Sequence, residues 1–383
     1  MAYDRRKMLG IIGGGSILAA SAGAGVFLST RTPTVALAPW QQAGHYREPR
    51  KRALSYAILA PNPHNRQPWQ VDLSQNDKII LFVDTDRLLP HTDPFNRQIT
   101  IGLGCFLELL RMAAAEDGYR ADIKQFPEGF ENEQLDKRPV ADITMVKDTN
   151  VQKDPLFTQV LLRRSLKEPF DTSKSVPDEV LNNLRKVVGS GVGVGTTNVA
   201  ERIGVLRKLT HEAMAIEIET PRTYQESVDL FRIGKSEVNA NPDGIDFSGP
   251  LFGSLALLGL FSREVALDTN SSAYQQGIDA VMANIDTAMG YIWLKTKGNG
   301  RIDQLNAGRD WLRVNLATTA LGVGLHPISQ VLQEYQEMTV QFDKIHHLLD
   351  ASGETVQMLG RLGYAQEVAP SPRWPLNAKI LEV

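Results

Sequence analysis

The chain has 383 residues, of which 42% are hydrophobic and 22% charged, and its formal net charge is −3. This length exceeds what one small core needs and suits one large domain or two fused units. The charge balance argues against a nucleic-acid partner, because no net positive field surrounds the molecule. The single cysteine, Cys105, excludes an internal disulfide and any metal site built from several cysteines.

The N-terminal stretch is typical of an export signal. Arg5-Arg6-Lys7 precede an uncharged run over residues 8–30, and a basic head before an apolar run is the pattern of a signal peptide. Residues 4–9 resemble a twin-arginine (Tat) signal, so the Tat translocase, which carries folded proteins, is the expected export partner. An ordinary transmembrane anchor is the alternative, because about 20 apolar residues can span a bilayer.

The end of this segment makes cleavage questionable. Ala36-Leu37-Ala38 fits a small-x-small cleavage site, but Pro39 follows, and its fixed φ and missing N–H make it a poor residue at a scissile bond. We therefore expect residues 1–38 to be a signal that can remain as a membrane tether through residues 8–30. The expected location is the periplasm or another extracytoplasmic space. Export of a folded protein also favours a bound redox cofactor, because the cofactor can travel inside the protein.

Residues 39–150 are expected to form a first unit. The apolar pattern predicts a helix that ends before Pro61 and a later, long helix that is apolar on most faces and therefore buried. Two strands are predicted around a polar turn, and a third closes the unit. These elements are helix 45–60, strands 70–73 and 79–83, helix 98–116 and strand 141–146.

Residues 151–383 are expected to form a second unit with a similar order. The predicted elements are helices 156–164 and 178–188, strand 191–199, helices 200–220, 274–297 and 309–321, and further elements at 333–349 and 356–362. The stretch 224–269 is predicted to be irregular, and a stretch this long inside a compact domain is more often a functional lid than a linker. The expected fold is therefore helix-rich α+β, in two similar halves.

The first candidate binding motif runs from Ala60 to Trp69, between a predicted helix and a predicted strand. Its three prolines hold the backbone extended and space a row of polar side chains: Asn62, His64, Asn65 and Gln67. Amide side chains offer both donors and acceptors, which suits the edge of a flat heteroaromatic ring. The alternative is a surface loop in which Trp69 fills the core.

The second motif contains Arg163-Arg164-Ser165 at the end of a predicted helix. Two guanidiniums and a hydroxyl can hold a phosphate, since guanidiniums bind it bidentately through charge-assisted hydrogen bonds. The alternative is a basic helix end exposed to solvent.

The third motif is a helix face of small residues that ends in Gly322-Val323-Gly324. Without side chains, the glycines let the backbone approach a planar ligand closely. The alternative is close helix packing followed by a glycine stop.

Other constellations carry weaker signals. The glycines between Gly189 and Gly193 fit no dinucleotide fingerprint, and no Gly-x-Ser-x-Gly motif is present. His346 and His347 are adjacent and diverge on a helix, so we expect them at the surface. His64 and His326 lie within the candidate motifs and could contact a ligand there. No histidine shows metal-ligand spacing, and no metal is expected.

Together, the three motifs resemble the nitroreductase family. The first is similar to its Pro-Ser-x-x-Asn-x-Gln-Pro-Trp flavin loop, and residues 163–170 are similar to its Arg-x-Ser-x-Arg-x-Phe motif, which binds the FMN phosphate and ribityl chain. Residues 321–324 resemble its Leu-Gly segment beside the flavin ring. Residues 371–373 resemble its C-terminal basic motif. The pattern is nearest to the Acg-type FMN-binding subgroup and covers about residues 45–383.

The resemblance implies FMN as the cofactor. The cofactor-binding residues that it implies are Asn62, His64, Asn65, Gln67, Arg163, Arg164, Ser165, Gly322, Gly324 and Arg373. In that family the Arg-x-Ser motif precedes the loop, and each FMN lies between two subunits. The reversed order here implies a single-chain pseudo-dimer. The second half shows no matching loop, so one flavin per chain is expected.

Some positions depart from the family pattern. Asn62-Pro63 replace a serine-rich pair, Lys167 stands where arginine is usual, and Ser371 replaces a basic residue near Arg373. Fewer positive charges then face the phosphate, and Arg66 is the residue that could compensate.

The expected function is that of an exported, FMN-dependent oxidoreductase that reduces a small acceptor, such as a quinone or nitro compound, through flavin N5. The resemblance identifies no catalytic side chain and leaves the small-molecule electron donor open. The alternative is a non-enzymatic protein that binds or sequesters FMN beneath a lid formed by residues 224–269. A third possibility is a structural protein without flavin.

Overall fold

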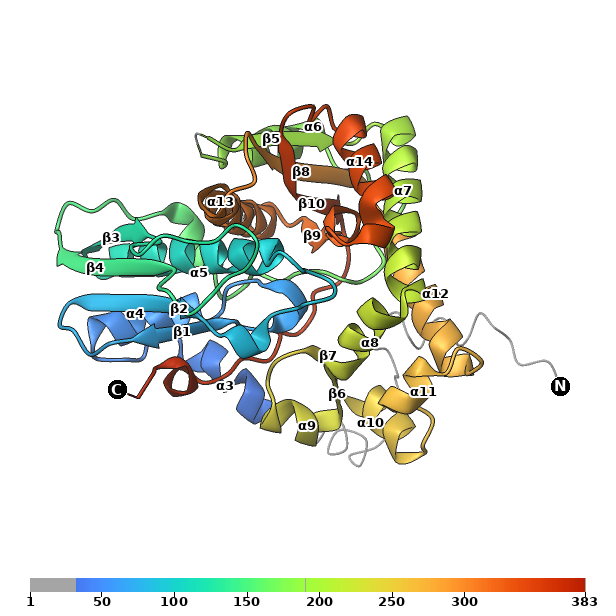
Figure 1. The fold of residues 1–383 in the computed structure, drawn as a ribbon, viewed down its shortest axis with the longest axis horizontal. Coiled ribbons are helices and arrows are strands. Elements are labelled where there is room, and N and C mark those ends of the chain that lie inside the picture. Colours follow the sequence, from blue (N-terminus) through green and yellow to red (C-terminus); the bar gives the residue numbers. More distant parts are fainter. Residues whose placement is uncertain (1–31, 190, 383) are drawn as a thin grey trace.

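The computed structural model describes residues 32–189 and 191–382 (Figure 1). The predicted Tat signal and the uncharged run at residues 8–30 lie outside the described residues. The described chain forms two four-stranded antiparallel sheets with helices between and around them. The expected α+β fold in two similar halves is confirmed.

The first half is built around one sheet with strand order β1-β2-β4-β3. The helix α5 covers this sheet and runs toward the second half (Figure 1). Its elements are α3 (Thr34–Gln42), α4 (Pro49–Ala57), η1 (Pro63–Asn65), β1 (Trp69–Asp72), β2 (Lys78–Val83), η2 (Thr85–Arg87), α5 (Arg97–Glu116), β3 (Tyr119–Gln125) and β4 (Ala141–Lys147).

The second half repeats this plan with strand order β5-β8-β10-β9. Helix α13 takes the place that α5 has in the first half, between the second and third strands. Its elements, apart from a long insertion, are η3 (Pro155–Gln159), α6 (Asp178–Lys186), β5 (Gly193–Thr197), β8 (Gly290–Thr296), α13 (Arg301–Ala320), β9 (Gly324–Pro327), η4 (Gln330–Leu332), η5 (Gln336–Met338), α14 (Thr339–Leu348), β10 (Thr355–Gly363) and η6 (Leu376–Lys379).

The two central helices, α5 and α13, join the halves through a close contact between glycines. A Cβ on Gly104 would lie 2.2 Å from the carbonyl oxygen of Leu305, and a Cβ on Gly308 would lie 2.0 Å from that of Ile101. Both glycines are the eighth residue of a 20-residue helix. The backbones can approach this closely only because neither position carries a side chain.

The first residue of each central helix reaches into the opposite half. Arg97 Nη1 donates to the carbonyl of Gln357 at 2.7 Å, and Arg301 Nη1 donates to the carbonyl of Phe95 at 2.8 Å. Both side chains are fully buried. The halves are therefore clasped by two arginines in equivalent places, one from each half.

The long insertion lies between β5 and β8, where the first half has only a short turn over residues 73–77. It comprises α7 (Ala200–Glu219), α8 (Pro221–Asp229), β6 (Phe231–Ile233), α9 (Gly234–Ala240), β7 (Ile245–Phe247), α10 (Pro250–Leu257), α11 (Arg263–Leu267) and α12 (Ser272–Asp286). The prediction of an irregular stretch at 224–269 is wrong: it contains helices and a parallel strand pair. Short helices broken by glycine and proline gave no sustained periodicity over this range.

Four other element predictions need correction. The helix predicted over 309–321 begins at Arg301. The helix predicted over 274–297 ends at Asp286, and β8 follows, because that mostly buried strand shows no alternation to separate it from a buried helix. The helix predicted over 156–164 is only the short 3₁₀ turn η3, and the one over 45–60 is confined to α4, which begins at Pro49. Strands β3 and β9 were not predicted.

Helix α5 is long and apolar enough to cross a bilayer, but almost all of its apolar stretch is buried inside the protein. It therefore serves as the core helix of the first half. Trp69 on β1 is fully buried against Phe106 of this helix, with ring centroids 5.1 Å apart. Trp69 therefore fills the core, as the alternative interpretation of the first motif proposed.

Candidate functional site

The Asn62–Gln67 loop has an unusual backbone. His64, Asn65 and Gln67 all have positive φ, at 47°, 51° and 50°. Non-glycine residues rarely adopt this left-handed region, and such conformations cluster at ligand sites, where the surrounding structure imposes them. The loop can press against α5 because Gly102 has no side chain; a Cβ there would lie 3.1 Å from that of Asn62.

The two terminal side chains of the loop, Asn62 and Gln67, hold its shape. The Asn62 Oδ1 accepts from the Gln67 N–H at 2.7 Å. The Gln67 amide donates to the carbonyl of Pro242 at 2.6 Å and accepts from the Trp374 N–H at 2.9 Å. Gln67 is fully buried, so it positions the loop from within rather than presenting its amide to a ligand.

Arg163 and Arg373 meet behind this loop. Arg163 Nη2 donates to the carbonyl of Leu59 at 3.0 Å, and Arg373 Nη2 donates to the same oxygen at 3.2 Å. Arg373 also donates to the Oδ1 of Asn65, and Arg163 Nη1 donates to the Oδ1 of Asn315 on α13 at 2.9 Å. The loop of the first half and the arginine motif of the second half thus lie next to each other.

Arg164 lies near the same cluster, beside Trp40. Its guanidinium lies 5.0 Å from the centroid of the Trp40 ring, and that of Arg373 lies 5.6 Å from it. The indole N–H donates to the carbonyl of Ser371 at 2.8 Å. Helix α3 therefore supplies an aromatic ring that contacts both cations.

Within residues 32–189 and 191–382, none of Arg163, Arg164 and Arg373 forms an ion pair with a carboxylate. Desolvation lowers the pKa of Arg164, and the charge of Glu367 opposes this shift. Desolvation lowers the pKa of Arg163 to about 10, and desolvation followed by repulsion from the other two arginines lowers the pKa of Arg373 well below its usual value. The Arg373 Nε is buried without any hydrogen-bond partner. An uncompensated buried charge is costly, so this cluster suits an anion.

The third motif packs against the second. The Leu166 N–H donates to the carbonyl of Leu325 at 2.9 Å, and a Cβ on Gly324 would lie 2.6 Å from Leu166. The space left by the missing side chain of Gly324 is therefore occupied by Leu166 and not by a ligand. Gly322 ends α13 with a φ of +66° and has open space where a Cβ would be, so its backbone is accessible.

Lys167 lies beside these motifs. Its side chain is exposed, and desolvation by the surrounding protein lowers its pKa.

His64 and His326, from the first and third motifs, lie near Lys167. Desolvation, then repulsion from Lys167 and Arg66, lowers the pKa of His64 to about 4. Desolvation, then the charges of Arg361 and Lys167, lowers the pKa of His326, whose Nδ1 lies 2.9 Å from the Nε of Arg361. Both imidazoles are therefore neutral at pH 7, and Lys167 and Arg361 are the basic side chains beside them.

Arg66 does not compensate for the missing charges of the phosphate motif. Its guanidinium turns away to Asp243 at 3.3 Å and to the carbonyl of Asp86 at 3.0 Å. Asp243 is nearly buried and also binds Arg87 and Arg232. These three arginines share one carboxylate that belongs to the insertion.

The insertion covers part of the loop. The Nε2 of His64 lies 3.1 Å from the hydroxyl of Ser227 on α8, and the Gly244 N–H donates to the carbonyl of Asn65 at 3.3 Å. Together with the contacts of Pro242 and Asp243, these bonds hold the insertion on the candidate site.

Several residues of the site were not predicted. Trp40 was missed because α3 begins within the segment attributed to the signal. Asn315 sits in the third motif and was overlooked because of its small-residue neighbours. Lys379, whose Nζ donates to the carbonyl of Gln67 at 2.8 Å, gave no local signal. Ser165 is partly accessible beside Arg164.

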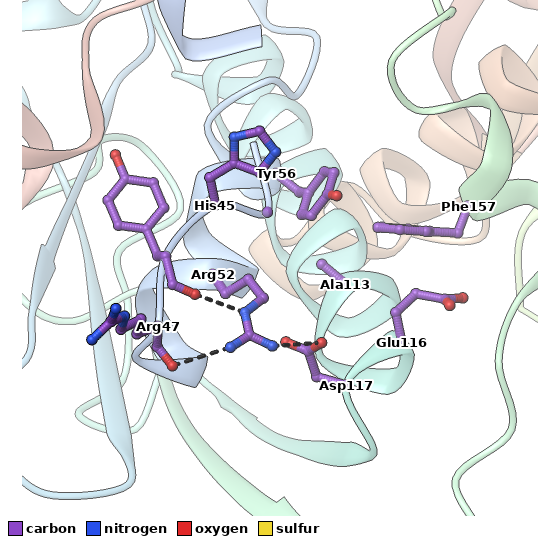
Figure 2. A pocket seen from close by; sticks show the side chains of 10 residues that line it. His45, Arg47, Arg52, Tyr56, Ala113, Glu116, Asp117 and Phe157 are labelled. Carbon is purple, nitrogen blue, oxygen red and sulfur yellow. Dashed lines mark hydrogen bonds and ion pairs between the residues drawn. The ribbon is translucent and has the colours of Figure 1, made fainter. Parts of the chain in front are cut away.

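A separate cavity of about 420 Å³ lies between α4, the end of α5 and η3. Figure 2 shows Arg52 in it, donating to the carbonyls of Tyr46 and Arg47 and pairing with Asp117 at 3.0 Å. None of the predicted binding residues lines this cavity, and its charged groups are largely paired. It is not the site that the three motifs form.

Comparisons with known proteins agree with the motif resemblance in part. No family model matches the chain. It is 25% identical over 329 residues to "Putative NAD(P)H nitroreductase acg" of Mycobacterium tuberculosis, covering 84% of this chain and 91% of that protein. A second protein of that organism with the same kind of name is 26% identical over 343 residues, covering 86% and 90%.

The solved structures that match include FMN-dependent nitroreductases, with chains about three fifths as long. NfnB of Mycobacterium smegmatis in complex with NADPH is 19% identical, with a TM-score of 0.36, covering 58% of this chain and 94% of that one. A nitroreductase with bound FMN from Bacteroides fragilis is 13% identical, with a TM-score of 0.34, covering 60% and 99%.

Proposed function

We propose that this chain is an FMN-binding oxidoreductase of the nitroreductase kind. The observation that carries the proposal is the cluster of Arg163, Arg164 and Arg373 beside a loop held in left-handed backbone. None of these arginines forms an ion pair with a carboxylate among the described residues. The relatives at 25% and 26% identity support it, since their names describe NAD(P)H nitroreductases and the similarity spans most of both chains.

The residues present fit the phosphate of FMN. A phosphate dianion would offset the repulsion among the three guanidiniums and satisfy the orphaned Nε of Arg373. The guanidiniums now donate to the carbonyls of Leu59 and Ala60, so binding exchanges carbonyl partners for charged ones. Ser165 adds a hydroxyl donor at the same place.

The residues around Lys167 fit the ring side of the cofactor. They combine the basic side chains of Lys167 and Arg361 with two neutral imidazoles, His64 and His326, and with the open backbone at Gly322. Cations beside neutral side chains favour electron-rich, anionic character in a bound heteroaromatic ring. We assign Asn65 and His64 to the ring edge and ribityl chain, and Lys167 to the electrostatics of the ring.

Bound FMN would supply the hydride or electron transfer. The chain's own residues would orient the cofactor, hold the insertion over the loop through the Ser227 and Pro242 contacts, and place Lys167 beside the ring. A quinone or nitro compound is the proposed acceptor. The donor is NAD(P)H or, outside the cytoplasm, a quinone or protein donor.

The test uses the full chain purified in detergent. We expect a flavin absorbance spectrum, bleaching with NADPH or dithionite, and recovery of the spectrum when a quinone or nitroaromatic compound is added. A protein that stays colourless after incubation with excess FMN would overturn the proposal. Riboflavin serves as the control, because it lacks the phosphate on which the arginine cluster acts.

A second candidate function is FMN storage without turnover, and the insertion is the observation that favours it. Ser227, Pro242 and Asp243 hold the insertion on the Asn62–Gln67 loop. If this cover excludes acceptors, the protein is coloured but inert. Asp243→Asn removes the charge that pairs with Arg66, Arg87 and Arg232 and should loosen the insertion. Asp229→Asn, which alters an exposed carboxylate of α8, is the matched control. Turnover that appears only in Asp243→Asn would support storage.

We propose further that the protein is exported by the Tat route and stays attached to the membrane. The proposed cleavage point after Ala38 falls inside α3, and the Ala36 carbonyl accepts from the Arg373 N–H at 2.8 Å. Cleavage there would remove part of the site, so retention of the segment is favoured. Replacing Arg5 and Arg6 by lysine should leave the protein in the cytoplasmic fraction, and unchanged export would contradict the Tat assignment.

A further inference from the structure

The tip of the insertion exposes a compact group of leucines. Leu257 and Leu258 are each 71% exposed and Leu260 is 55% exposed. They lie at the end of α10, within a stretch that contains no charged residue between Asp246 and Arg263. Exposed apolar patches of this kind mark contact with a protein or a membrane.

Backbone hydrogen bonds fix the conformation of the leucine tip, which consists of Leu257, Leu258 and Leu260. The Leu260 N–H donates to the carbonyl of Leu255 at 2.9 Å and the Gly259 N–H to that of Ala256 at 3.0 Å, with Gly259 at a φ of +69°. This is the Schellman arrangement that ends a helix sharply. The leucines are therefore exposed because the helix ends in an ordered cap, and not because its last turn is frayed.

An aromatic cluster supports the tip from beneath. Phe247, Phe252 and Phe261 pack against one another with ring centroids 4.9–5.5 Å apart, and Phe231 contacts Phe247 at 4.6 Å. These rings bury the inner face of α10. Leu257, Leu258 and Leu260 lie outside this small core. Polar residues at these exposed positions would leave the aromatic core unchanged.

The position of the tip relative to the N-terminal run indicates what covers it. The uncharged run of the sequence ends at Thr30, four residues before α3 begins at Thr34, and four residues can span at most about 14 Å. The Ala36 N–H of α3 donates to the Oδ1 of Asn239 on α9 at 3.1 Å, and α9 packs against α10. Figure 1 shows α3, α9 and α10 along one edge of the molecule.

We infer that this edge docks on a lipid bilayer, with the leucine tip of α10 inserted among the lipids beside the tether of residues 8–30. Val35 on α3, 67% exposed, adds a further apolar side chain at the same edge. A leucine-rich segment without charges suits the boundary between headgroups and acyl chains. The inference rests on the proposed tether but not on FMN binding.

Docking would place the insertion between the membrane and the candidate site. The segment that carries the tip also holds His64 through Ser227 and Gln67 through Pro242. Lipid contact at α10 can thus act on the cover of the site, which suits an acceptor that partitions into the bilayer, such as a quinone.

The test labels the tip with an environment-sensitive fluorophore. The sole cysteine, Cys105, is buried and burial raises its pKa to about 12, so a thiol reagent reaches only an introduced cysteine. Leu258→Cys reports on the tip, and Val340→Cys, an exposed apolar position on α14, is the control. The full-length proteins are reconstituted into phosphatidylcholine–phosphatidylglycerol vesicles and separated by flotation.

We expect both proteins to float, with a blue shift and quenching by doxyl-labelled lipids only for the label at position 258. Flotation with an aqueous spectrum at position 258 would overturn the inference while leaving the tether intact. Failure to float would overturn both. A blue shift without vesicles that grows with protein concentration would identify a second copy as the occupant and also overturn the inference.

Discussion

Two buried guanidiniums, those of Arg163 and Arg373, meet behind the Asn62–Gln67 loop, and the partly accessible Arg164 lies beside them. Repulsion among the three favours an anion at this place. Arg373 is the most constrained, since it is buried, is repelled by Arg163 and Arg164, and has an Nε without a hydrogen-bond partner among the described residues. Such a group stabilises the folded protein poorly on its own, and we propose that its role is to bind the phosphate.

We expect Arg373→Ala to weaken FMN binding by about ten- to a hundred-fold, because each charge-assisted hydrogen bond is worth roughly 1.5–3 kcal/mol. Arg373→Lys should retain part of the affinity, since lysine keeps the charge but cannot donate two parallel hydrogen bonds as a guanidinium does. Titration by flavin fluorescence measures both, and riboflavin affinity should barely change. An equal loss for FMN and riboflavin would show that Arg373 only supports the fold.

The low pKa of His64, about 4, predicts a pH dependence of stability. Because desolvation lowers the folded-state pKa below the unfolded value of 6.5, the unfolded chain binds more protons between these two pH values. The contribution of His64 to stability is complete above pH 6.5 and declines as the pH falls toward 4. We expect the free energy of unfolding of the wild type to fall more steeply than that of His64→Asn in this window. Parallel curves from urea unfolding would contradict this.

At the scale of elements, the joint between the halves depends on two glycines. Gly104 and Gly308 stand at the same position of α5 and α13, and each faces the backbone of the other helix. Since the candidate site draws residues from both halves, the spacing of these helices also sets the distance between the loop and the arginine motif.

Gly308→Ala should therefore destabilise the protein, by about 1–3 kcal/mol as for an overpacked core. The control is Gly204→Ala within α7, where a Cβ would meet nothing within 4 Å, and where the change should stabilise by roughly 0.5–1 kcal/mol through helix propensity. Melting temperatures of the two variants should move in opposite directions. A Gly308→Ala protein as stable as the wild type would show that the helices can separate freely.

At the scale of the whole molecule, the two halves have the same strand order but different sites. Seven residues after the contact glycine, α13 has Asn315, which accepts from Arg163 at 2.9 Å. The equivalent residue of α5 is Arg111, which pairs with Glu108 at 2.7 Å and lies 3.7 Å from Asp154. Arg313 pairs with the same two carboxylates, Glu108 and Asp154. The arginines of the second position are thus already paired and are not free to hold a phosphate.

We therefore expect one FMN per chain. The ratio follows from flavin absorbance after denaturation, set against protein concentration and the mass of the native particle. A ratio near one supports a single site, and a ratio near two would contradict the view that these ion pairs close the second position to a phosphate. Substituting Glu108 and Asp154 by glutamine tests whether the two carboxylates exclude the second flavin.

The sequence alone determined most long elements and the chemistry of the motifs. Helix α5 and strands β1 and β2 were predicted within a residue or two, because their apolar periodicity reflects burial that persists over many residues. The motif residues were identified from residue type and from the resemblance to the nitroreductase family, because guanidinium, hydroxyl and amide side chains are donors that suit a phosphate and a ring edge.

Tertiary structure alone decided which of those residues face a ligand. Gln67 carries a binding motif but is enclosed by Pro242 and Trp374, and Arg66 is drawn away by Asp243. These partners are distant in sequence, so no local pattern encodes them. The meeting of Arg163 with Arg373 and the Gly104–Gly308 joint arise likewise from contacts across two halves, because side-chain direction depends on the packing of the whole chain.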